Sequence, residues 1–199
     1  MIYIVLTSVF MLIGLITFIP RLQSRFQKYN LGINYFLTLI ATLVGVLLAI
    51  TITNFEESQK EKSDVIKLLN ASIESVDTSY DYTDELLQYE TTLKDNDSRK
   101  VDFFIKNPAP YPDYLDTFIM QNIVSKNLSE PVLSDLNALL INLKVSKRKS
   151  IPLYLKFLKQ TIKTLELEIL YQKGLLTNLQ LESNLDMLEK ATLKVINDE

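Results

Sequence analysis

The most unusual chemical feature of this sequence is a run of cations without a single acid. Between Leu136 and Leu165 there is no Asp or Glu, and seven cationic side chains lie there: Lys144, Lys147, Arg148, Lys149, Lys156, Lys159 and Lys163. The stretch carries +7 and the rest of the chain −10, because the net charge is −3. A helix beginning after Ser150 would add free backbone N–H groups beside these cations. The residues therefore predict a site for an anion, such as a nucleotide or a short nucleic acid.

A row of carboxylates supplies the opposite charge at helical spacing: Glu74, Asp77, Asp81, Asp84 and Glu85. Such a row can hold Ca²⁺ or Mg²⁺ or do acid–base chemistry. A solvated helix face, or a complement to the basic stretch, explains it with fewer assumptions. Pairing with this acidic row is also an alternative explanation of the basic stretch. Contact of the basic stretch with anionic lipid headgroups is a third explanation.

Several classes of chemistry are excluded by composition. The chain has no Cys and no His, so it has no thiol nucleophile, disulfide, imidazole base or Cys/His zinc site. Asp95–Lys106 begins like a calcium loop but has Lys where that loop needs Gly and Glu. We therefore expect no enzyme, catalytic residue, metal or cofactor. Aromatic side chains that could stack bases are more simply explained as core: Phe103, Phe104, Tyr111, Tyr114 and Phe118.

The first part of the chain has the composition of a membrane segment. Only Arg21, Arg25 and Lys28 are charged in the first 55 residues. Residues 1–55 therefore predict a transmembrane hairpin, with spans at about 1–20 and 32–53 and a basic loop at 21–31. A cleaved signal peptide is the alternative for the first span, but that span lacks a basic start.

The second predicted span has one polar and small-residue strip: Asn34, Thr38, Thr42, Gly45 and Ala49. Small residues spaced by four let helix backbones approach closely. The strip could pack on the first span, form an oligomer interface or line a water-filled pore.

Residues 56–199 predict a helical soluble domain, because apolar residues recur at helical spacing and Gly occurs once, at Gly174. We expect a stalk at 56–94, loops and short helices at 95–147, and one long helix at 151–196, bent at most near Gly174. The short helices would run from Pro112 to about Ser125 and from Ser129 to about Val145. The stalk has a heptad seam like that of a coiled coil: Ile66, Leu69, Ile73, Val76, Tyr80, Thr83 and Leu87. The fold class is thus all-α, with a helical bundle that we expect to be oligomeric.

The charge count does not decide which side of the membrane this domain faces. Three cations lie in the loop, and three follow the second span: Lys60, Lys62 and Lys67. The compact loop slightly favours an external domain. A nucleotide ligand requires a cytoplasmic one, and we give the basic stretch more weight.

Two resemblances follow from these residues. Gly45-Val-Leu-Leu-Ala49, followed by Asn54-Phe55-Glu-Glu57, resembles a membrane-exit pattern of several uncharacterised bacterial membrane families, in which the aromatic is usually Trp. The two-span layout with a small sensing domain resembles the small membrane effectors of bacterial anti-phage defence. That resemblance implies a homo-oligomer that permeabilises the inner membrane in response to a nucleotide signal.

The sequence thus favours a non-enzymatic membrane effector or channel, gated by an anion on the basic stretch. Its partners would be the membrane, further copies of itself and a nucleotide or short nucleic acid. The alternative is a membrane-anchored adaptor whose helical domain docks a protein partner outside the cytoplasm.

Overall fold

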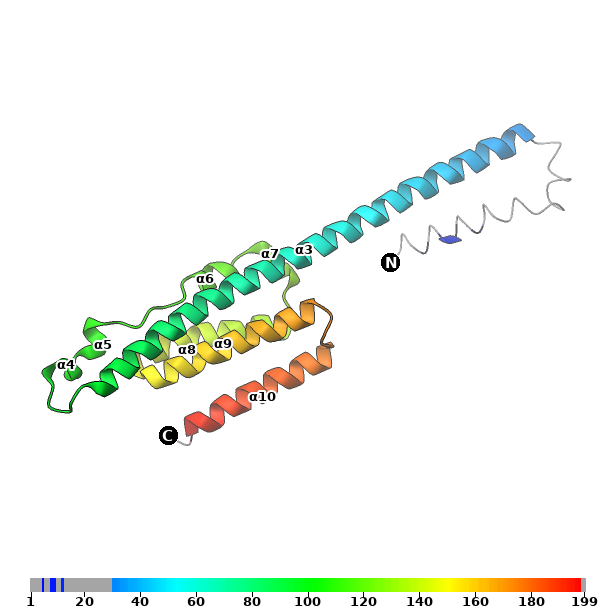
Figure 1. The fold of residues 1–199 in the computed structure, drawn as a ribbon. Coiled ribbons are helices and arrows are strands. Elements are labelled where there is room, and N and C mark those ends of the chain that lie inside the picture. The colour runs from blue at the N-terminus through cyan, green and yellow to red at the C-terminus, as the bar shows by residue number, and fades with distance from the viewer. Residues whose placement is uncertain (1–4, 6–7, 10–11, 13–29, 198–199) are drawn as a thin grey trace. The chain divides into compact units, whose positions relative to one another are not determined.

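The computed structural model describes residues 5, 8, 9, 12 and 30–197 (Figure 1). This part of the chain contains helices and no strand, which confirms the predicted all-helical class for it. Apart from residues 5, 8, 9 and 12, the first predicted span and the loop up to residue 29 lie outside the described residues. The chain divides into two compact units, Met1–Lys60 and Glu61–Glu199.

The longest element is α3, Asn30–Thr92, which runs from one unit into the other. No Gly or Pro lies between positions 46 and 107. Asn54, which could have ended the helix at the membrane exit, costs only about 0.7 kcal/mol relative to Ala in a helix interior. The helix therefore continues through Asn54 into the predicted stalk.

The N-terminal part of α3 is apolar and uncovered. Among the described residues one helix, Asn34–Thr92, is long and apolar enough to cross a membrane, with a mean hydropathy of 2.5 in its most apolar stretch. Only 11% of that stretch is buried within the chain. A core helix of a soluble protein would be mostly buried, so this exposed apolar surface is evidence of membrane association.

The seam of the stalk lies in the core of the second unit. Leu69, Val76 and Thr83 are completely buried, and the seam residues between them are partly buried against the same cluster. The hydroxyl of Thr83 donates to the carbonyl of Ser79 within the helix, so it is satisfied without another helix. The chain's own helices therefore cover this seam.

Between α3 and the C-terminal helices the chain forms four short helices. They are α4 (Ser98–Val101), α5 (Phe103–Lys106), α6 (Tyr114–Ile119) and α7 (Asn122–Asn127). The helix expected from Pro112 to Ser125 is thus divided in two, because Gln121 adopts extended backbone at the start of α7. α8, Glu130–Lys149, follows, with Ser129 at its N-cap position and Pro131 in its first turn.

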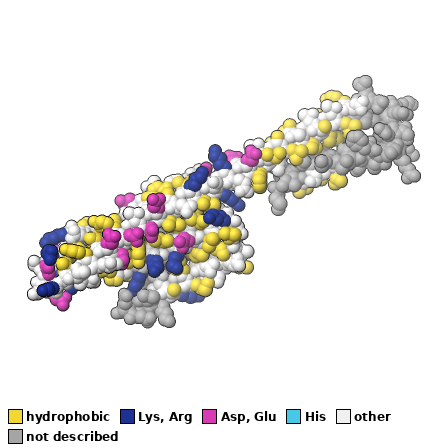
Figure 2. Space-filling model, in the orientation of Figure 1, with side chains coloured by type: hydrophobic (Ala, Val, Ile, Leu, Met, Phe, Trp, Pro, Cys, Tyr) yellow, Lys and Arg dark blue, Asp and Glu magenta, His cyan; other side chains and the backbone are white. Residues whose placement is uncertain are grey.

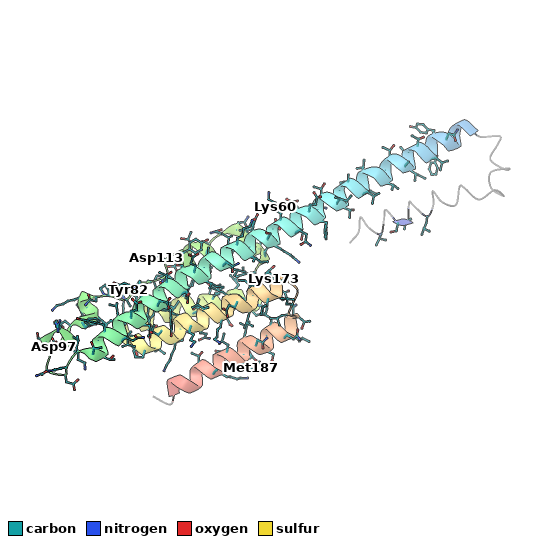
Figure 3. The ribbon with its side chains drawn as sticks, viewed as in Figure 1. Lys60, Tyr82, Asp97, Asp113, Lys173 and Met187 are labelled. Atoms are coloured by element: carbon teal, nitrogen blue, oxygen red, sulfur yellow. The ribbon has the colours of Figure 1, made fainter. Side chains whose placement is uncertain are left out.

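The single long helix predicted for 151–196 is wrong. The structure has two helices there, α9 (Ile151–Gln172) and α10 (Asn178–Asn197). Gly174 has φ +72°, a left-handed conformation that Gly adopts at little cost and that ends a helix. Figure 3 labels Lys173 at this turn, from which α10 folds back along α9. On the inner face of α10, Leu181 and Leu185 are buried.

Candidate anion-binding pocket

The basic stretch is divided by a sharp corner between α8 and α9. Ser150 has extended backbone, with φ −155° and ψ 111°, and its hydroxyl accepts a hydrogen bond from the Leu153 N–H at 3.4 Å. Pro152 favours a helix start because its φ is fixed at a helical value. α9 therefore begins at Ile151 and packs along α8.

A pocket of about 540 Å³ lies at this corner, within the second unit. Three consecutive cations at the end of α8 form one wall, and the end of α3 and the segment around α5 form the others. The lining is Lys147, Arg148, Lys149, Ser150, Ile151, Pro152, Leu87, Glu90, Phe104, Ile105, Pro108 and Ala109. Three cations face one carboxylate, so the pocket has an excess of positive charge.

The backbone contributes less to this pocket than the sequence suggested. Pro152 has no N–H, and the N–H groups of Leu153 and Tyr154 are bonded to Ser150. At most the N–H of Ile151 remains in the first turn. The cationic side chains must therefore supply most of the attraction for an anion, and they also stabilise the C-terminal end of α8.

Lys144 is held in a different place. Its Nζ donates to Asp116 Oδ1 at 2.9 Å and lies 5.5 Å from the centroid of the Tyr111 ring. Lys147 Nζ lies 5.9 Å from the same ring. Burial, with the nearby carboxylate of Asp116, raises the pKa of the Tyr111 hydroxyl, so the ring stays neutral. Lys144 thus joins α8 to α6 and does not line the pocket.

The three remaining lysines line a separate groove. Lys156, Lys159 and Lys163 on α9 border a hollow of about 180 Å³, whose other wall consists of Leu188, Ala191 and Thr192 on α10. The seven predicted anion-binding residues are therefore distributed over three places. Only Lys147, Arg148 and Lys149 come together in the larger pocket.

The other predicted features lie as follows. Glu74, Asp77, Asp81 and Glu85 are exposed on α3, and Asp84 is half-buried. Among the residues that the structure describes, no group of three acidic side chains could hold a metal ion. Phe118 and Phe103 are buried, as expected for core aromatics, and Phe104 lines the pocket.

The polar strip of the predicted second span lies on exposed faces of α3: Asn34, Thr38, Thr42, Gly45 and Ala49 are all exposed. A Cβ added at Gly45 would meet no atom within 4 Å. The hydroxyls of Thr38 and Thr42 donate to the carbonyls four residues earlier, at 2.8 and 2.9 Å. The buried positions of this segment are instead Ile40 and Leu47.

Sequence reasoning missed one polar centre, a completely buried carboxylate on α9. Glu168 accepts hydrogen bonds from the Ser129 N–H at 3.1 Å, the Ser129 hydroxyl at 2.6 Å and the Gln172 amide at 2.7 Å. The available signal was an acid between Leu165 and Ile169, on the apolar stripe of the helix. Glu168 holds the start of α8 against α9.

Among the described residues, the fold is thus a helical bundle, and one of its helices, α3, is long and apolar enough to cross a membrane. No protein family, curated protein or solved structure matches this chain.

Proposed function

We propose that this chain is a homo-oligomeric membrane effector or ion channel of the bacterial inner membrane, gated by an anionic ligand. The observation that carries the proposal is the corner pocket lined by Lys147, Arg148 and Lys149. The ligand is a nucleotide or oligonucleotide, and the role is a response such as anti-phage defence. In this proposal the chain has two spans, and its helical unit lies in the cytoplasm.

The route from ligand to membrane is α3. Leu87 and Glu90 line the pocket, and they belong to the same helix as the apolar segment. An anion beside the three cations repels the Glu90 carboxylate, so binding shifts the equilibrium position of the end of α3. The strip of Asn34, Thr38 and Thr42 then lines the pore or packs against a neighbouring helix of the pore.

The adaptor alternative has less support, because the heptad seam on which it depended lies in the chain's own core. A reporter fused at Glu199 separates the two functions. Activity on the cytoplasmic side is expected, and an external C-terminus rules out a sensor of cytosolic nucleotides.

The charge of the pocket is the direct test. We expect reversal of Lys147, Arg148 and Lys149 to Glu to change membrane permeability by about 10-fold, because a cationic site becomes an anionic one. The measurement is dye uptake by bacteria that express the chain, and ion flux in vesicles with and without a mixture of ribonucleoside triphosphates.

The matched control reverses three exposed lysines elsewhere, Lys94, Lys173 and Lys190, with the same change in net charge. We expect normal permeability from this control. If circular dichroism shows that the charge-reversed pocket variant does not fold, the neutral K147Q/R148Q/K149Q variant replaces it. Unchanged permeability in a folded pocket variant contradicts ligand gating.

A further inference from the structure

Two rows of opposite charge lie on two helices of the second unit. On α3, Glu74, Asp77, Asp81 and Glu85 are exposed, on the side of the helix opposite the buried Leu69 and Val76. The face that carries the acidic row is therefore not used by the core.

The basic row lies on α9 at the edge of its groove with α10. Lys159 and Lys163 are exposed, and Lys156 is half-buried. Leu188 and Ala191 of α10 form an apolar wall beside the lysines. A partner helix that carries acids at helical spacing could place them beside the lysines and cover this wall.

The acidic row of a second copy has the required spacing. Figure 1 shows that α3 and α9 run in opposite directions, and Figure 2 shows acidic side chains over α3 and basic ones over α9 on one face. Along α3, the exposed Asp77 and Asp81 are four residues apart. Along α9, the exposed Lys159 and Lys163 have the same spacing. The exposed acids can therefore lie opposite the exposed lysines in either helix direction, and antiparallel pairing is the direction that leaves the two copies parallel.

We propose that this face binds a second copy of the chain about a two-fold axis parallel to the helices. The acidic row of each copy lies on the α9–α10 groove of the other, as a two-fold interface requires. Copies related by such an axis run parallel, so both can enter one membrane from the same side. The inference rests on the homo-oligomeric part of the proposed function and names its interface.

Because the chain has no Cys, single introduced cysteines test the interface between copies directly. The full-length Asp81→Cys chain is mixed in detergent with the full-length Lys159→Cys chain and oxidised. We expect a disulfide-linked dimer, with a yield about 10-fold above that of a Met120→Cys and Lys159→Cys mixture. Met120 is 84% exposed and lies outside both rows, so it controls for random collision. A yield equal to the control overturns the proposal.

Charge reversal then tests whether the two rows of opposite charge hold the copies together. One chain carries Asp77→Lys and Asp81→Lys, and the other carries Lys159→Glu and Lys163→Glu. Each alone should be monomeric by light scattering, and their mixture should dimerise, because both contacts are complementary again. Circular dichroism confirms that each chain is folded. If the mixture stays monomeric, or if each reversed chain still dimerises, the proposal is wrong.

These measurements are independent of permeability. A dimer that does not permeabilise vesicles contradicts the proposed function and leaves this interface intact. Permeable vesicles formed by a chain that fails both cross-linking and charge exchange contradict the interface alone.

Discussion

At the scale of single residues, Glu168 shows how one side chain joins two helices. Ser129 occupies the N-cap position of α8 but does not cap it with its own side chain. Its hydroxyl instead donates to Glu168, and Gln172 donates both to Glu168 and to the carbonyl of Asn127. The start of α8 is therefore fixed by the last turns of α9, which a sequence pattern of caps cannot show.

Replacing Glu168 with Ala should destabilise the bundle by about 3 kcal/mol, because three partly buried hydrogen-bond donors lose their acceptor. For a chain of this size the loss corresponds to a fall of roughly 6–12 °C in the unfolding temperature. Thermal loss of helical circular dichroism in detergent measures it. Glu166→Ala, an exposed acid two residues earlier, is the control and should change little. Equal effects of the two substitutions would contradict the role of Glu168.

The basic stretch shows what a sequence can and cannot predict about a site. The cluster of charge is visible in the residues, and three of the seven cations do line one pocket. The division among three places depends on the turn at Ser150 and on the ion pair of Lys144 with Asp116, 28 residues apart. Neither the direction of the turn nor that partner is encoded in local spacing.

At the scale of elements, acidic side chains of α8 and α10 line the same hollow, which is electrostatically unfavourable. Asp135 on α8 shares a hollow with Glu189 on α10, and α9 contributes Phe157 and Gln160 to it. Burial, followed by the charges of Glu189 and Asp186, raises the pKa of Asp135 above its ordinary value of 3.8. The native state therefore binds the Asp135 proton more tightly than the unfolded chain. This contribution to stability is fully present below the unfolded-state pKa and is lost as pH rises through the folded one.

We therefore expect Asp135→Asn to raise the unfolding temperature at pH 7, by less than about 3 °C because the carboxyl is partly solvated. The gain should shrink as pH falls toward 4, where the parent protein also becomes protonated at this position. Thermal unfolding at both pH values measures it. Glu182→Gln, an exposed change on α10, is the control. A gain that is the same at both pH values would show that charge is not the cause.

The α9–α10 turn explains why the C-terminal half was predicted incorrectly. The apolar stripe continues through Leu176 and on to Leu181 and Leu185, so periodicity alone shows no interruption. Gly174 marks a point of bending, but a Gly inside a helical pattern does not say whether the helix bends or ends. The reversal occurs because Leu181 and Leu185 become buried in the same core as α9, a tertiary contribution.

At the scale of the whole molecule, prediction succeeded where the signal is local and failed where it is not. The length and apolarity of α3 follow from consecutive residues and need no partner. The side of α3 that is covered could not be predicted. The sequence pattern indicated the polar strip as a packing or pore-lining face, whereas Ile40 and Leu47 are the buried residues of this segment. The strip itself is exposed among the described residues.

A pore and a plain anchor differ in whether water reaches that strip. Thr42 lies on it, and Leu43 lies at the same depth about 100° around the helix; both are exposed within the chain. In membranes we expect a water-soluble thiol reagent to label Thr42→Cys about 10-fold faster than Leu43→Cys, because only a water-filled path admits a charged reagent. Ser58→Cys, beyond the apolar segment, should be labelled fastest. Equal slow labelling of positions 42 and 43 would indicate an anchor, and equal fast labelling would place this segment of α3 outside the bilayer.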